Sequence, residues 1–213
     1  MTKLGMLIDR GRCIGCQTCA NACKMNNNVP MGMLWTRTVT EGCERADDAI
    51  GQYPNLTRSY LPIACQHCEN AACLRACPTG ATYKDDKGRV EVDYDKCIGC
   101  RMCMAACPYG VRMFNWEDPK RDPDFNYGDS RVPVRPRGVA EKCTLCKERT
   151  DSGDKPMCVV SCPTNARIFG DLDDPNSEVS KAIKAKGGYQ LLEEKGTRPQ
   201  IHYCNQSKER EDV

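Results

Sequence analysis

Hydrophobic and polar residues alternate in only a few short stretches of this chain, and these stretches predict short elements. Residues 4–9 (LGMLID) predict a strand. Residues 81–96 place a turn at 86–88 between alternating segments, with Val90 and Val92 on one face, which predicts a β-hairpin. Residues 35–40 favour one more strand, and residues 198–204 (RPQIHYC) predict an extended segment.

One helix is predicted near the C-terminus. Asp174 is the expected N-cap, Pro175 the first helical residue, and Gly187 the residue that ends the helix. Together with the extended segment, this helix makes residues 171–213 a C-terminal docking tail.

Two long insertions separate the regular segments. Residues 26–59 contain scattered Pro and Gly and predict an irregular loop. In residues 111–139, four prolines exclude a helix or a central strand. Segments of this length without a core of their own commonly bind other molecules, so we expect both insertions to form subunit interfaces.

Sixteen of the 18 cysteines fall into four motifs, and these motifs carry the candidate chemistry. The third motif has the spacing C-x2-C-x2-C-x3-C-P, which is the bacterial ferredoxin spacing for [4Fe–4S] ligation. In that pattern three cysteines hold one cluster and the fourth ligates its neighbour, so paired clusters are expected. The four motifs are Cys13, Cys16, Cys19, Cys23; Cys65, Cys68, Cys73, Cys77; Cys97, Cys100, Cys103, Cys107; and Cys143, Cys146, Cys158, Cys162.

The motifs are internal repeats. The first and third share D-x-x-[RK]-C-I-G-C-x-x-C-x-x-A-C, starting at Asp9 and Asp93. The second and fourth share C-P-T-[GN]-A, starting at Cys77 and Cys162. Repeats predict the same local structure twice. In C-I-G-C the glycine lies where the backbone must turn closely and a Cβ atom would be crowded.

Three residues near or outside the motifs have open roles. Cys43 and Cys204 belong to no motif, and Cys43 is expected to be a free thiol. His67 lies between two motif cysteines and is open to a ligand role. Because four cysteines are already available, a surface or hydrogen-bonding role is favoured.

Other readings of the cysteines are weaker. A disulfide-rich secreted protein would fit the cysteine content, but the tetrad spacing and the absence of a signal-like start oppose it. Structural zinc would fit each C-x2-C pair, but the third motif brings its thiolates too close together for a zinc ribbon. A thioredoxin-like site lacks the surrounding βαβ pattern. No apolar run is long enough to cross a bilayer.

The charge balance changes once clusters are considered. The formal charge of +2 treats cysteine as neutral, and four clusters of about −2 each would bring it to about −6. The 31 Lys and Arg residues are then interpreted as compensation for buried anions. Because no basic block is present, no nucleic-acid partner is expected.

In order and spacing, the four motifs resemble those of the four-cluster iron–sulfur subunits of the molybdopterin oxidoreductase family, of the dimethyl sulfoxide reductase type. The resemblance runs from Asp9 to about Gly170. It implies an α+β fold of tandem bacterial 2[4Fe–4S] ferredoxin-like lobes with long irregular insertions. Residues 1–25 with 140–170 would form one lobe, and residues 60–110 the other.

The resemblance also implies four ligand sets, in which motif 1 pairs with motif 4 and motif 2 with motif 3. Cluster 1 would lie nearest the molybdenum subunit and cluster 4 farthest from it. Since Cys100 is present, four [4Fe–4S] clusters are expected, without the [3Fe–4S] centre of some relatives. The implied sets are Cys13, Cys16, Cys19, Cys162 (cluster 1); Cys143, Cys146, Cys158, Cys23 (cluster 2); Cys65, Cys68, Cys73, Cys107 (cluster 3); and Cys97, Cys100, Cys103, Cys77 (cluster 4).

The implied function is electron transfer without catalysis. The chain would relay electrons between a molybdopterin catalytic subunit and a redox partner, which is a quinone-linked membrane subunit or a soluble carrier. The alternative is an independent soluble polyferredoxin. The expected location is the cytoplasm, or the periplasm by co-export with a signal-bearing partner. Terminal substrate and direction of electron flow belong to the partner chains.

Overall fold

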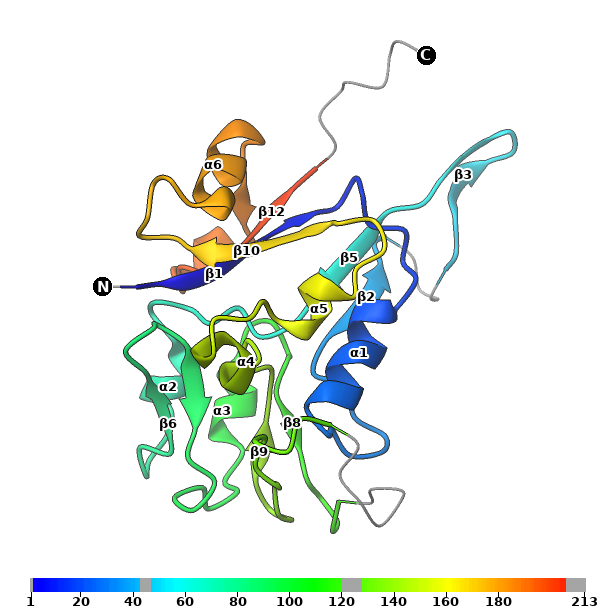
Figure 1. Ribbon diagram of the computed structural model, residues 1–213. Helices are drawn as coiled ribbons and strands as arrows, with labels where there is room; N and C mark the ends of the chain where they lie inside the picture. Colours follow the sequence, from blue (N-terminus) through cyan, green and yellow to red (C-terminus); the bar gives the residue numbers. More distant parts are fainter. Residues whose placement is uncertain (1, 43–46, 120–127, 206–213) are drawn as a thin grey trace.

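The computed structural model describes residues 2–42, 47–119 and 128–205 and shows an α+β protein of short elements (Figure 1). The helices are α1 (Thr18–Asn26), α2 (Ala72–Arg75), α3 (Met102–Ala105), α4 (Lys147–Asp151), α5 (Met157–Val160), α6 (Glu178–Ala185) and the 3-10 helix η1 (Glu193–Lys195). The strands are β1 (Leu4–Asp9), β2 (Arg37–Thr40), β3 (Ile50–Gln52), β4 (Asn55–Thr57), β5 (Tyr60–Ile63), β6 (Thr82–Lys84), β7 (Val90–Val92), β8 (Met113–Phe114), β9 (Ala140–Glu141), β10 (Arg167–Asp171), β11 (Tyr189–Gln190) and β12 (Ile201–Cys204).

The main sheet joins the two ends of the chain in the order β10–β1–β12–β11. Strand β1, predicted from its sequence, pairs antiparallel with β10 and parallel with β12. The extended segment predicted at residues 198–204 is therefore confirmed as β12. The C-terminal segment is part of this sheet, so it does more than offer a docking surface.

The alternation of side chains along β1 builds a core on each face of the sheet. Met6 and Ile8 pack against Val159 of α5, next to the fourth cysteine motif. Leu7 points the other way and packs against Val179 of α6. Figure 1 shows α6 and α5 on opposite sides of this sheet. The fourth motif is thus fixed against β1 by ordinary apolar packing.

The predicted C-terminal helix exists, but its predicted start was wrong. The N-cap of α6 is Ser177, whose side chain accepts a hydrogen bond from the backbone N–H of Ser180 at 3.2 Å. Asp174 instead accepts from the backbone N–H of Asn176 at 2.8 Å, and so closes a turn before the helix. Gly187, with φ 60°, follows the end of the helix as expected.

The first insertion is more regular than the prediction of an irregular loop. The expected strand near residues 35–40 is confirmed as β2, which pairs with β5. A second antiparallel pair, β3 with β4, was missed. Pro62 lies within β5 and is tolerated there, because each strand of a two-stranded ribbon is an edge strand.

The described part of the second insertion contains no helix, as the prolines predicted. Strand β8, near its start, pairs with β9, which directly follows its end. Val132, Arg135 and Val139 are buried within the chain, so this segment is not confined to the surface.

The repeats have the predicted common backbone. Gly15 and Gly99 have φ values of 71° and 69°, and a Cβ atom would lie 2.4 Å from the ring of Tyr60 or from the carbonyl oxygen of Gly138. The hairpin predicted between the second and third motifs is confirmed as β6–β7. Helix α1 packs against α5 and α2 against α3, so motif 1 meets motif 4 and motif 2 meets motif 3.

Candidate metal centres

Two cavities lie where the second and third motifs meet. Each is lined by three cysteines of one motif and the last cysteine of the other, as expected from the crossed ligation of paired clusters. The first cavity is lined by Cys65, Cys68, Cys73 and Cys107, and the second by Cys77, Cys97, Cys100 and Cys103.

A third cavity lies against β1 and involves the first and fourth motifs. It is lined by Cys23, Cys143, Cys146 and Cys158, which again combine three cysteines of one motif with the last of another. Cys65 of the second motif also lines this cavity, so the sets containing Cys143 and Cys65 are neighbours.

The remaining four cysteines are placed less fully. Burial raises the pKa of Cys13, and Cys19 and Cys162 are close enough to raise it further. Cys16 is exposed and contacts the hydroxyl of Thr18, with 3.3 Å between sulfur and oxygen. Among the described cysteines, only Cys16 and Cys100 are exposed.

The donor sets fit a soft, multinuclear centre. Each of the three cavities is lined by at least four cysteines and by no carboxylate. Iron–sulfur clusters and zinc both prefer thiolate ligands of this kind. In the described ranges, no group of three or more Cys, His, Asp or Glu side chains converges as ligands of one ion would. The sulfur atoms surround a space, and a cluster with four iron corners would fill such a space.

Hydrogen-bond donors point at several of these sulfur atoms. The side-chain amide of Asn27 donates to the sulfur atoms of Cys23 at 3.4 Å and Cys146 at 3.7 Å. Backbone N–H groups donate to the sulfur atoms of Cys77 (3.4 Å) and Cys162 (3.3 Å). Donors to ligand sulfurs stabilise the anionic state and raise cluster potentials.

The thiol pKa values separate two environments. Burial, followed by repulsion from neighbouring thiolates, raises the pKa of Cys23 and Cys143 well above its ordinary value. Burial also raises the pKa of Cys77 and Cys162, but hydrogen bonds from backbone N–H groups and threonine hydroxyls outweigh it and lower the pKa of both. The buried thiols therefore need a metal partner to be ionised within the protein.

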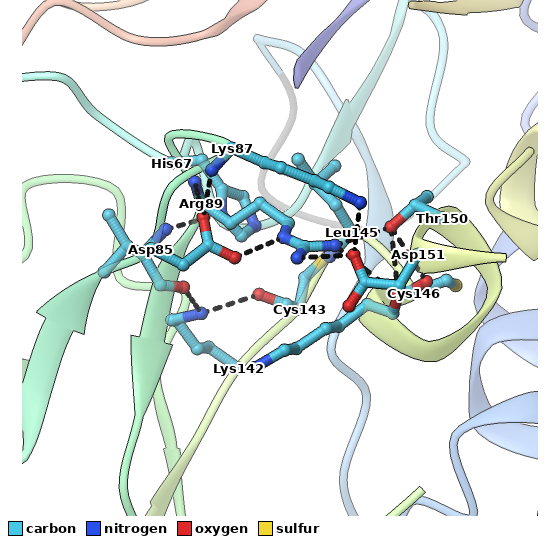
Figure 2. A network of polar contacts seen from close by, with 12 residues as sticks. His67, Asp85, Lys87, Arg89, Lys142, Cys143, Leu145, Cys146, Thr150 and Asp151 are labelled. Atoms are coloured by element: carbon cyan, nitrogen blue, oxygen red, sulfur yellow. Dashed lines mark hydrogen bonds and ion pairs between the residues drawn. The ribbon is translucent and has the colours of Figure 1, made fainter. Parts of the chain in front are cut away.

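His67 has the hydrogen-bonding role that the sequence favoured, but it is not on the surface. It is fully buried, and its Nδ1 accepts a hydrogen bond from the backbone N–H of Val90 at 3.1 Å. Figure 2 shows it in a polar network with Arg89 and Lys142. Arg89 is paired with Asp85 at 2.6 Å.

Three buried cationic residues beside the cysteines were missed by the sequence analysis: Arg112, Lys142 and Arg167. Two of them had a signal, because Arg112 and Arg167 each lie five residues after the Cys of a Cys-Pro step, in CPYGVRMF and CPTNARIF. Lys142 directly precedes Cys143, as a basic residue also precedes the first cysteine of motifs 1 and 3.

The two unassigned cysteines are outside these sets. Cys204 is fully buried on β12, where it packs with Leu7 and Val179. Cys43 lies outside the described residues. None of the described helices combines the length and the apolar composition that crossing a bilayer requires.

Comparisons with known proteins agree with this chemistry. The 4Fe-4S dicluster domain family matches residues 56–122 and 132–172, and the 4Fe-4S binding domain family matches residues 4–25. A protein of Halobacterium salinarum, provisionally named as an iron–sulfur subunit of dimethyl sulfoxide reductase, is 54% identical over 96% of this chain and 80% of its own length.

Two further relatives cover nearly the whole chain. The arsenate respiratory reductase iron–sulfur subunit of Shewanella is 38% identical over 94% of this chain and 95% of its own length. A subunit of the sulfite dehydrogenase of Allochromatium vinosum is 41% identical over 99% of this chain and 86% of its own length. The resemblance carried by the cysteine motifs is thus confirmed: the chain belongs to the family of iron–sulfur electron-transfer subunits of molybdopterin oxidoreductases.

Proposed function

We propose that this chain is a non-catalytic subunit that relays electrons through four [4Fe–4S] clusters, between a molybdopterin catalytic subunit and a second redox partner. The observation that carries the proposal is that each of three cavities is lined by three cysteines of one motif and the last cysteine of another, which supports an exchange of the fourth ligand. The names of the relatives, which are subunits of reductases and a dehydrogenase, support a catalytic partner.

The ligand sets we propose are those implied by the motifs. Cys13, Cys16, Cys19 and Cys162 would hold cluster 1, and Cys143, Cys146, Cys158 and Cys23 would hold cluster 2. Cys65, Cys68, Cys73 and Cys107 would hold cluster 3, and Cys97, Cys100, Cys103 and Cys77 would hold cluster 4. Residues 1–25 with 140–170, and residues 60–110, would then be two ferredoxin-like lobes.

The arrangement of these sets supports a linear relay. Set 2 adjoins set 3, because Cys143 and Cys65 line the same cavity. Among the cysteines that the structure describes, the two exposed ones are Cys16 and Cys100. They belong to sets 1 and 4, the two ends of the row. Electrons would enter and leave at these ends, where a partner can approach a ligand closely.

Bound clusters supply one-electron redox chemistry, and the chain supplies the ligands and their environment. Asn27 and the backbone donors near Cys77 and Cys162 hold negative charge on the sulfur atoms. Burial of Cys23 and Cys146 keeps water from their sulfur atoms. Each of these features adjusts a reduction potential or limits solvent access.

Metal content of the native protein tests the function. The chain should be isolated gently and anaerobically from its own host, with co-eluting proteins retained. About sixteen iron atoms per chain, with molybdenum or tungsten in the same peak, are expected. Sixteen iron atoms without molybdenum, tungsten or a partner would favour a free carrier, and zinc in place of iron would refute the proposal.

Substitution of Cys100 tests the ligand sets. Cys100 is exposed and belongs to set 4 alone. Cys100→Ser should therefore alter the EPR signal of one cluster and leave the other three unchanged. Cys204→Ser is the control, since Cys204 belongs to no set and should leave all four signals in place. Four unchanged signals in Cys100→Ser would contradict the assignment.

A further inference from the structure

A buried arginine lies between the first and second sets. Arg167 is 6% exposed, and its Nη2 donates to the sulfur of Cys19 in set 1 at 3.3 Å. It also lines the cavity of set 2. Burial lowers the pKa of Arg167, but the thiolates of Cys158 in set 2 and Cys19 in set 1 outweigh this and raise it. The guanidinium therefore faces both sets.

A second buried arginine lies between the third and fourth sets. Arg112 is 4% exposed, and its Nη2 donates to the sulfur of Cys73 in set 3 at 3.1 Å. It lines the cavities of both set 3 and set 4. Burial lowers the pKa of Arg112, but Cys73 and then Cys103 of set 4 raise it. The repeated sequence C-P-x-x-[AV]-R-[IM]-F places Arg112 and Arg167 equivalently.

The remaining interval, between sets 2 and 3, contains Lys142. Lys142 is 1% exposed, and its Nζ donates to the carbonyl oxygen of Val90. The same Nζ donates to the carbonyl oxygen of Cys143 at 2.9 Å (Figure 2). Cys143 belongs to set 2. Val90, the other acceptor, lines the cavity of set 3, so the ammonium group lies beside set 3 as well.

These three residues differ from the other basic residues near the motifs. The equivalents of Lys142 in motifs 1 and 3 are Arg12 and Lys96, and both are exposed. Buried Arg89 is paired with carboxylates, whereas none of the three cations forms an ion pair with a carboxylate among the described residues. Lys142 does lie near Glu91, but burial raises the pKa of Glu91 to about 7, so that carboxyl is only partly ionised at neutral pH.

We propose that Arg167, Lys142 and Arg112 are positioning residues of the relay, each fixing one positive charge in the interval between two neighbouring clusters. A reduced cluster is more negative than an oxidised one, so a buried cation favours its reduction. The same charge offsets repulsion between adjacent clusters when both are reduced. The inference rests on the proposed function, because it requires the four ligand sets.

The test is the pattern of potential shifts across the four clusters. Arg167→Gln, Lys142→Met and Arg112→Gln each remove one charge, and EPR-monitored redox titration of the anaerobically isolated, cluster-loaded protein gives four midpoint potentials. Arg167→Gln should lower the potentials of clusters 1 and 2, Lys142→Met those of clusters 2 and 3, and Arg112→Gln those of clusters 3 and 4. Each shift should be about tenfold in the reduction equilibrium constant, or about 59 mV for a one-electron couple.

Two further sets of variants separate charge from structure. Lys96→Met is the matched control, because Lys96 also precedes the first cysteine of a motif but its side chain is 65% exposed. Because solvent screens the charge of Lys96, Lys96→Met should change the reduction equilibrium constants by less than about threefold. Arg167→Lys and Arg112→Lys retain the charge, so the reduction equilibrium constants of their clusters should also stay within about threefold of those of the unmodified protein.

Three results would overturn the inference. One is unchanged potentials in the charge-removing variants at full iron content. Another is a uniform shift of all four potentials in every variant. The third concerns the case in which the charge-removing variants fail to assemble clusters. Arg167→Lys and Arg112→Lys then provide the test, and a tenfold shift of the reduction equilibrium constant in these variants would exclude a charge effect. Unmodified protein that lacks iron would instead refute the proposed function.

Discussion

Removal of the iron is expected to unfold most of the chain. The candidate ligands are also core residues: Cys23 packs with Val29 and Trp35, and Cys65 packs with Tyr109 and Val111. Without metal, these buried thiols would line cavities that no apolar side chain fills, and packing would be lost. Bound clusters are therefore expected to fill a large part of the core.

The free energy that metal binding contributes is large enough to predict the loss of cooperative structure around the clusters. Structural metal sites of the zinc-finger type contribute about 10–16 kcal/mol per ion, whereas a typical domain is stable by only about 5–15 kcal/mol. Loss of even one four-cysteine centre is then enough to unfold its surroundings. Anaerobic treatment with reductant and chelator should abolish the near-ultraviolet circular dichroism, and reconstitution with iron and sulfide should restore it.

One region should remain folded longest after the iron is removed. The core between β1 and α6 contains Leu7, Val179 and Ile183 and no candidate ligand. Hydrogen exchange should therefore show residual protection there after chelation, while β6, β7 and the short helices exchange freely. Reductant alone is the control. Retention of a cooperative unfolding transition after complete iron removal would contradict a structural role for the clusters.

Local spacing made part of this molecule predictable. The alternation in LGMLID predicted β1, and the shared C-I-G-C segments predicted one backbone for Gly15 and Gly99. The spacing of the third motif also predicted paired clusters in which the fourth cysteine reaches the neighbouring cluster. These features depend on neighbours in sequence, so sequence reveals them. The pairing of motif 1 with motif 4 came from the family resemblance and not from spacing.

Long-range environment was not predictable. Lys96 and Lys142 occupy the same motif position, but only Lys142 is buried, since β7 covers it. The parallel pairing of β12 with β1 joins residues nearly the whole chain apart, and nothing in either strand specifies the other. The predicted start of α6 was wrong for a local reason. Both Asp174 and Ser177 are residue types that cap helices, but Ser177 caps α6 and Asp174 closes the turn before it.

The second large effect concerns the buried ion pair of Arg135 with Glu141, whose contacts with Trp35 connect the second insertion to the first. Glu141 is fully buried and lies 3.4 Å from Nε of Arg135, and it accepts hydrogen bonds from Trp35 (3.1 Å) and Asn115. The guanidinium of Arg135 stacks over the ring of Trp35, 4.8 Å from its centre, and donates to the carbonyl oxygen of Asn27. Through Arg135, this group of residues is connected to Asn27, whose side chain donates to the sulfur atoms of Cys23 and Cys146 in set 2.

Glu141→Ala should lower the free energy of unfolding by about 3–5 kcal/mol, because it leaves the Arg135 guanidinium buried without a countercharge. The exposed pair of Lys155 with Glu178 supplies the control, since Lys155→Ala should cost about 1 kcal/mol or less. Urea midpoints of the anaerobic, cluster-loaded proteins measure both. Arg135→Met combined with Glu141→Ala should recover part of the loss by removing both charges. A double variant no more stable than Glu141→Ala alone would mean that the hydrogen bonds from Trp35 and Asn115 to Glu141, and not the charge of Arg135, hold the two insertions together.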